Sequence, residues 1–162
     1  MSIAVFAGSF DPFTVGHLDI VKRAAPHFEK FYVTVSPNPG KGSAMFSWEE
    51  RIELIESAVK GIDNVIVTGF TGLLVDHCHE VGADVLIRSI RNGSDVDYER
   101  QLETVNRQVD PSIETMYVLA RSEYAYISST LVRELIGIGI DISRMVPEMH
   151  PIILNKINNI NN

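Results

Sequence analysis

The chain has 162 residues and carries 21 acidic against 14 basic side chains, a formal net charge of −7 with histidine neutral. With 45% hydrophobic and 22% charged residues, it has the size and composition of one folded domain, which excludes a disordered chain. The acidic balance argues against a nucleic-acid partner, because such binding needs many lysines and arginines. An anionic ligand would therefore have to meet a local basic cluster.

The sequence has no features typical of a membrane protein or of a protein from an oxidising compartment. Its single cysteine, Cys78, has no partner within the chain, as is typical of a reducing compartment. The N-terminus lacks the basic start and long apolar stretch of a secretory signal, and no run reaches the roughly 18 apolar residues of a membrane span. We therefore expect a cytoplasmic protein that does not bind membranes.

Five short apolar runs alternate with longer stretches of helical periodicity. The predicted strands are residues 3–6, 31–35, 65–67, 85–87 and 115–119. This alternation is typical of βα units wound around a parallel sheet. We predict an α/β fold over residues 1–162: one Rossmann-like domain, with a five-stranded parallel sheet and helices on both faces.

The predicted helices separate these strands and close the chain. They cover residues 16–25, a segment that starts after Ser47, and residues 73–80, 95–109, 131–136 and 151–157. Ser47 and Glu50 have the spacing of a capping box, and Gly61 is a suitable end for that helix. Pro26 and Pro111 mark the ends of two others. The asparagine-rich tail from about 158 is expected to fray.

The most informative segment follows the first predicted strand and enters a helix. It reads Ala7-Gly8-Ser9-Phe10-Asp11-Pro12-Phe13-Thr14-Val15-Gly16-His17. The carboxyl edge of an open α/β sheet is where ligands bind, and a helix N-terminus attracts phosphate. Thr14 and His17 share one helix face and could converge on one phosphate. Taken alone, the same pair could be a helix cap and a surface histidine.

Two later segments also carry phosphate-binding chemistry. Arg88 and Arg91 follow the fourth strand, on the same rim as His17, and the planar arginine fork donates bidentately to phosphate. Three consecutive hydroxyl residues, 128–130, precede the fifth helix. They could be simple capping residues, or they could hold phosphates together with the N–H groups of that helix.

Together these segments resemble the Gly-Ser/Thr-Phe-Asp-Pro, Thr/His-x-Gly-His and Ile-Ser-Ser-Ser/Thr signatures of the nucleotidyltransferase α/β-phosphodiesterase superfamily. Lys41, the Arg88-x-x-Arg91 spacing and Tyr98-Glu99 make the chain similar to the bacterial phosphopantetheine adenylyltransferases, from about residue 3 to residue 150. It departs from that family at Ala7, at Ser89 and at Gly42, where proline, glycine and a second lysine are common.

The resemblance implies transfer of AMP from ATP to 4′-phosphopantetheine by direct in-line displacement, in coenzyme A biosynthesis. The implied catalytic residues are His17, Lys41, Arg88 and Arg91. The implied ATP-binding residues are Ser9, Phe10, His17, Ser89, Ile90, Arg91, Glu99, Tyr124, Ala125, Tyr126, Ile127, Ser128, Ser129 and Thr130. The implied acceptor-binding residues are Ser9, Lys41, Leu74 and Arg88. The resemblance also implies Mg²⁺ carried by the ATP phosphates, a homohexamer and feedback binding of coenzyme A.

Several points stay open at the level of sequence. The attacking phosphate is already an anion, so His17 is expected to donate a hydrogen bond, with its protonation state undecided. Nicotinamide mononucleotide or a small alcohol phosphate are alternative acceptors, and a non-catalytic nucleotide-binding module is an alternative of another class. His77, Cys78 and His79 are potential metal ligands, but adjacent helical residues point about 100° apart, so we predict no metal site on the protein.

Overall fold

A parallel sheet forms the centre of the computed structural model, which describes residues 2–37 and 44–161. Within those ranges its strands are β1 (Ile3–Gly8), β2 (Lys30–Val35), β3 (Val65–Gly69), β4 (Val85–Ile90) and β5 (Glu114–Leu119). Their spatial order is β3-β2-β1-β4-β5, and every neighbouring pair is parallel. The order reverses between β1 and β4, which makes their carboxyl ends the topological switch point where such sheets bind ligands.

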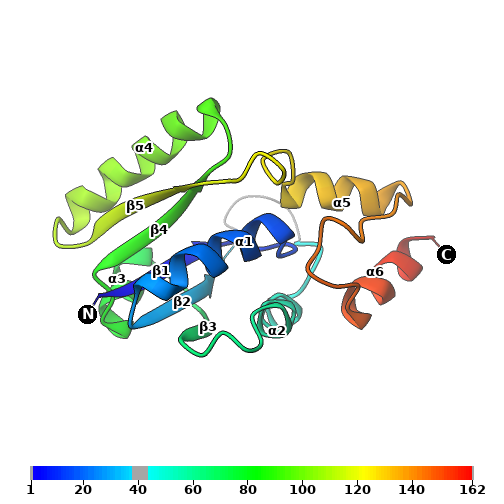
Figure 1. Cartoon of the computed structure of the whole chain (residues 1–162), viewed down its shortest axis with the longest axis horizontal. Helices are drawn as coiled ribbons and strands as arrows, with labels where there is room; N and C mark the ends of the chain where they lie inside the picture. Colours follow the sequence, from blue (N-terminus) through cyan, green and yellow to red (C-terminus); the bar gives the residue numbers. More distant parts are fainter. Residues whose placement is uncertain (1, 38–43, 162) are drawn as a thin grey trace.

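Helices connect the strands and continue beyond the sheet (Figure 1). They are α1 (Val15–Ala24), the short 3₁₀ turn η1 (Ala25–His27), α2 (Trp48–Ala58), α3 (Leu74–Val81), α4 (Gly93–Val109), α5 (Ser129–Gly137) and α6 (Pro151–Asn161). The predicted Rossmann-like α/β fold with a five-stranded parallel sheet is confirmed. No helix in the described part of the chain is long and apolar enough to cross a membrane.

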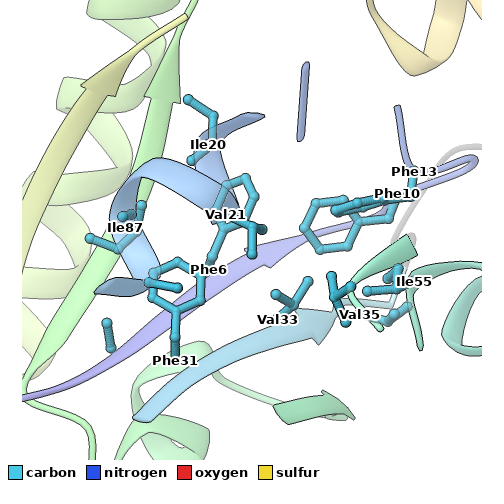
Figure 2. Close-up of a cluster of buried hydrophobic side chains, with 14 of the residues drawn as sticks. Phe6, Phe10, Phe13, Ile20, Val21, Phe31, Val33, Val35, Ile55 and Ile87 are labelled. Atoms are coloured by element: carbon cyan, nitrogen blue, oxygen red, sulfur yellow. The ribbon is translucent and has the colours of Figure 1, made fainter. Parts of the chain in front are cut away.

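The two faces of the sheet bury different helices. Successive strand residues point to opposite faces, so Phe6 and Val5 of β1 belong to different clusters. Phe6 packs with α1 and α2 residues such as Ile20 and Ile55 (Figure 2). Val5 lies in the cluster that α3 completes through Cys78. Helices therefore cover both faces, as predicted.

A third cluster lies beyond the sheet and joins the C-terminal helices to the rest of the domain. Phe46, just before α2, and Leu54 of α2 pack with Val132 and Ile136 of α5 and with Ile153 of α6. The backbone N–H at the start of α1 also donates to a carbonyl in the segment between α5 and α6, at 2.9 Å. These contacts hold α5 and α6 against the rest of the domain, and a bond from Ser129 Oγ to the Pro12 carbonyl places the N-terminus of α5 beside the β1–α1 loop.

Several element boundaries differ from the predictions for local reasons. β1 and β4 continue to Gly8 and Ile90 because they pair with β2 and β5 along their whole length. The Asn92 side chain accepts a hydrogen bond from the Asp95 N–H, so α4 begins at Gly93. Ser128 caps α5 in the same way, so that helix begins at residue 129. α2 ends at residue 58, before the predicted stop, and α6 continues past 157 to residue 161.

Candidate active site

A cavity of about 470 Å³ opens at the carboxyl ends of β1 and β4. This volume lies within the range of small-molecule sites. Its walls come from the β1–α1 loop, the end of β4, the first turns of α4 and the start of α5. The residues predicted for the site that line it are Ser9, Phe10, His17, Arg88, Ser89, Arg91, Glu99, Tyr124, Ile127, Ser128, Ser129 and Thr130.

The β1–α1 loop is shaped by a left-handed residue whose ring is buried. Phe10 has φ +46°, a region that few side chains adopt, and is only 3% exposed. Its ring packs edge-on against Phe6 and Phe13. A Cβ at Gly8 would lie 2.9 Å from that ring, so this position requires glycine. Burial of the ring thereby holds the backbone of the loop against the cavity.

His17 is both part of a helix cap and part of the cavity wall. The side chain of Thr14 accepts from the His17 backbone N–H at 3.3 Å, and His17 Nδ1 accepts from the Thr14 N–H at 3.0 Å. An imidazole whose Nδ1 accepts carries its proton on Nε2. Burial, helped by the nearby Arg91 guanidinium, lowers the His17 pKa to about 4. The neutral ring therefore has an Nε2–H donor available at neutral pH.

The two predicted arginines are held by carboxylates of α4. Arg88 donates to both oxygens of Glu99, at 2.7 and 2.8 Å, and its Nη1 donates to the Ala7 carbonyl at 3.1 Å. Arg91 pairs with Asp95, whose carboxylate also accepts from the Arg91 backbone N–H at 2.9 Å. Burial opposes ionisation of Asp95, but these bonds outweigh it and lower its pKa. The guanidinium groups on this rim are therefore oriented before any ligand arrives.

The hydroxyls before α5 combine the two roles that the sequence left open. Ser128 Oγ accepts from the Leu131 N–H at 3.0 Å, so it is a helix cap whose own O–H remains a donor. Ser129 Oγ donates to the Pro12 carbonyl at 2.8 Å and ties α5 to the β1–α1 loop. Thr130 is exposed and lies on the cavity wall.

Other predicted residues lie outside the walls of this cavity. Ile90 ends β4 and faces a separate groove between α4 and β5. Leu74 begins α3 and packs against the cluster on that side of the sheet. Ala125 and Tyr126 belong to the turn before α5 but do not line the cavity, and Tyr126 is largely exposed. Lys41 lies outside the described residues. Their proposed ligand contacts remain predictions.

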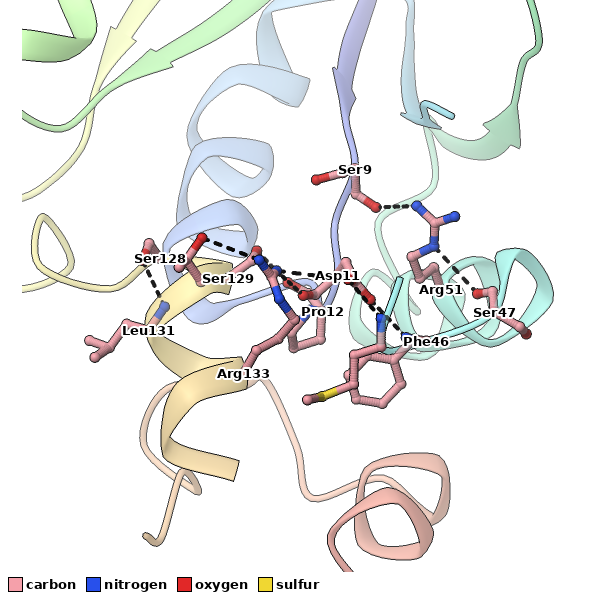
Figure 3. Close-up of polar contacts among 12 residues, drawn as sticks. Ser9, Asp11, Pro12, Phe46, Ser47, Arg51, Ser128, Ser129, Leu131 and Arg133 are labelled. Carbon is pink, nitrogen blue, oxygen red and sulfur yellow. Dashed lines mark hydrogen bonds and ion pairs between the residues drawn. The ribbon is translucent and has the colours of Figure 1, made fainter. Parts of the chain in front are cut away.

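Asp11 and Arg133 also line the cavity, and no role was predicted for either. Asp11 is 2% exposed, and its carboxylate accepts from the backbone N–H groups of Met45 and Phe46 at 3.0 and 2.8 Å. Arg133 donates to the Asp11 carbonyl at 2.6 Å (Figure 3) and to Thr130 Oγ1 at 3.3 Å. Arg133 lies one helical turn after the hydroxyl residues, a spacing that could have indicated a shared face.

The histidine–cysteine–histidine segment of α3 does not converge on one point. His77 stacks on Phe70 and approaches the Thr34 and Thr68 hydroxyls at 3.4 Å. His79 is on the surface beside Asp110. Across residues 2–37 and 44–161, no group of three or more metal-binding side chains is found.

Comparisons with known proteins agree with this architecture. The cytidylyltransferase-like family model matches residues 5–135. A proposed nicotinate-nucleotide adenylyltransferase from Vibrio parahaemolyticus superposes with a TM-score of 0.71 at 20% identity, covering 98% of this chain and 93% of that one. A bifunctional NMN adenylyltransferase/ADP ribose pyrophosphatase from Francisella tularensis superposes with a TM-score of 0.73 at 17% identity, covering 99% of this chain. This chain spans 50% of the Francisella protein.

The structural likenesses establish the fold, since their sequence identities are low. The family match covers most of the chain and contains the β1–α1 loop, His17, both predicted arginines and the start of α5. The chain therefore belongs to the cytidylyltransferase-like family, within the nucleotidyltransferase superfamily.

Proposed function

We propose that the protein is an adenylyltransferase that moves AMP from ATP to 4′-phosphopantetheine, giving dephospho-coenzyme A and pyrophosphate. The observation that carries this proposal is the convergence of three distant segments on one cavity. His17 comes from the start of α1, Arg88 and Arg91 from the end of β4, and residues 128–130 from the start of α5. Each supplies N–H or O–H donors suited to phosphate oxygens.

The proposed reaction is a direct displacement at phosphorus. An oxygen of the acceptor phosphate forms a bond to the α-phosphorus of ATP, while the bond to the pyrophosphate oxygen breaks and pyrophosphate leaves with the electron pair. No general base is needed because the attacking oxygen carries no proton. Such a reaction asks the protein for alignment, worth about 7–11 kcal/mol, and for stabilisation of charge on the phosphoryl oxygens.

The described residues suit these two tasks. The Nε2–H of His17 is a neutral donor held in place by the Thr14 cap, so it can stabilise the α-phosphoryl oxygens without giving up a proton. The first N–H groups of α5 and the Ser128 hydroxyl suit the leaving phosphates. Arg133 adds a guanidinium on the same wall.

The acceptor rests on the resemblance to the phosphopantetheine adenylyltransferases. It is supported by Arg88, which lines the cavity and is pre-oriented by Glu99; the acceptor contacts that the resemblance implies for Lys41 and Leu74 remain predictions. The nicotinate- and nicotinamide-nucleotide adenylyltransferases with the same fold make a pyridine mononucleotide the competing acceptor.

The remaining elements of the proposal concern the surroundings of the reaction. The carboxylates of Asp95 and Glu99 are already bonded to arginines, which fits a Mg²⁺ ion carried by the ATP phosphates and water. That ion would supply further charge neutralisation on the phosphates. A homohexamer, feedback binding by coenzyme A and a cytoplasmic location are likewise proposed from the resemblance.

The test measures pyrophosphate release from ATP or CTP with each of three acceptors: 4′-phosphopantetheine, nicotinamide or nicotinate mononucleotide, and glycerol 3-phosphate. Turnover with ATP and phosphopantetheine alone supports the proposal. Turnover with another acceptor preserves the nucleotidyltransferase assignment and rejects the substrate. Nucleotide binding without turnover for every acceptor supports a non-catalytic module.

A further inference from the structure

Arg51, in the first turn of α2, is a buried cation bound to main-chain carbonyls. It is 5% exposed, and its Nη1 donates to the Ser9 carbonyl at 2.7 Å (Figure 3). Longer bonds of 3.4 Å reach the carbonyls of Ser36 and Ser47. Within the described residues no carboxylate lies within ion-pair distance of it. Burying a guanidinium without a counter-ion lowers the stability of the fold, so the three carbonyl bonds of Arg51 are expected to serve a role other than charge pairing.

The position of Arg51 sets the direction of one peptide plane. Ser9 and Phe10 line the cavity, whereas Arg51 and its other partners Ser36 and Ser47 do not. Arg51 therefore contacts the Ser9 carbonyl from the side of the loop that faces α2 and the end of β2, outside the cavity wall. The Ser9–Phe10 peptide is trans, and the carbonyl and N–H of a trans peptide point in opposite directions. The Phe10 N–H is thus directed to the cavity side.

That N–H has no internal acceptor among residues 2–37 and 44–161. A buried backbone donor normally finds a partner in the protein, in water or in a ligand. The left-handed φ of Phe10 and the packing of its ring keep the donor from turning back into the loop. The Phe10 N–H is therefore a fixed donor near His17. The ring centroids of Phe10 and His17 are 5.0 Å apart.

We infer that Arg51 is a positioning residue, which holds the Phe10 N–H as a hydrogen-bond donor to a phosphate oxygen of the nucleotide. This inference rests on the proposed function for the nature of the ligand. A donor fixed in advance stabilises a phosphoryl oxygen without reorganisation when the ligand arrives. Arg51 itself touches no substrate and acts only through the Ser9–Phe10 peptide.

The first experiment compares nucleotide affinity in Arg51→Lys and in the unaltered protein by calorimetry with ATP, CTP and inorganic pyrophosphate. Lysine keeps the charge but cannot span the three carbonyls. We expect the Kd for ATP to rise about tenfold, the loss typical of a hydrogen bond to a charged group. If Arg51→Lys does not fold, Arg51→Gln, whose amide can still reach one carbonyl, serves the same comparison.

Asn64→Ala is the matched control for general loosening. Asn64 Nδ2 also donates to two main-chain carbonyls, those of Ala25 and Phe28, but at the amino ends of the strands, away from the cavity. This variant should melt at a lower temperature while its Kd for ATP stays unchanged. A rise in Kd in Asn64→Ala as large as in Arg51→Lys would show that destabilisation alone weakens binding, and would overturn the inference.

A spectroscopic readout separates positioning from a structural role. In protein labelled with ¹⁵N-phenylalanine, the Phe10 amide, assigned by its absence in Phe10→Tyr, should move downfield on ATP binding. In saturated Arg51→Lys that displacement should be reduced. Equal affinity with an equal Phe10 displacement in both proteins rejects the inference and leaves the proposed function standing. A Phe10 displacement with CTP alone supports the inference and rejects ATP as the donor, and binding of neither nucleotide rejects both.

Discussion

Replacing His17 by asparagine separates its role as a helix cap from its role as a donor. Asparagine Oδ1 can take the place of Nδ1 and accept from the Thr14 N–H, so the cap is retained. The variant loses the Nε2–H and the titrating ring. The ring contacts with Phe10 and Phe13 are lost at every pH, so only the pH dependence of stability is compared between the two proteins.

The size of that pH dependence follows from the His17 pKa, which burial and then Arg91 lower from 6.5 to about 4. Between these two pKa values, His17 is protonated in the unfolded chain but neutral in the folded protein. The free energy of unfolding therefore falls as the pH falls from about 6.5 toward 4. At ~1.36 kcal/mol per pKa unit, the full loss is about 3 kcal/mol, and about 2 kcal/mol is lost by pH 5. Above about 6.5 the contribution of His17 no longer changes.

Urea unfolding between pH 4.5 and 7.5 measures this loss directly. The unaltered protein should lose about 2 kcal/mol more than His17→Asn between pH 7.5 and 5. At pH 7.5 the variant should also turn over about a hundredfold more slowly, because the donor to the phosphoryl oxygens is gone. Parallel pH profiles for the two proteins, or a His17 ring resonance that titrates near 6.5, would refute the neutral-donor reasoning.

Three further predictions address the contacts around the cavity and the edge of the sheet. Glu99→Gln should lower the free energy of unfolding by about 3 kcal/mol, because it leaves the half-buried Arg88 guanidinium without its carboxylate partner. In urea denaturation, the double variant with Arg88→Met should regain part of that lost stability. No regain would contradict the pairing. Asp11→Asn should cost about 2 kcal/mol in thermal unfolding, because an NH2 donor would replace one of the two oxygens that accept from the Met45 and Phe46 N–H groups, and the charge facing Arg133 would be lost; an unchanged melting temperature would argue against this. Light scattering should show a hexamer for the unaltered protein and a smaller species for Leu119→Glu, since Leu119 is exposed on the edge strand β5; a monomeric unaltered protein would refute the predicted assembly.

The order of the strands and helices could be predicted from the sequence because it depends on local patterns. Alternation of apolar runs with helical periodicity predicted the parallel sheet, and the Ser47–Glu50 capping box is present as expected. The same reasoning placed His17, Arg88 and Arg91 on one rim, because parallel strands end at the same edge of a sheet; the start of α5 was predicted only as a helix cap or phosphate site, and the Ser129–Pro12 bond places it beside the β1–α1 loop. The cavity gathers these segments.

The state of the individual side chains in that cavity was decided by tertiary contacts. Arg51 reaches Ser9 from 42 residues away, and Arg133 reaches Asp11 from 122 residues away, so no local pattern reveals either bond. The sequence by itself identified His17 as a donor, but its neutral form depends on burial and on Arg91 from the loop after β4. Periodicity and motif spacing determine which residues arrive at the sheet edge. Desolvation and the partners supplied by distant segments determine what each one can donate there.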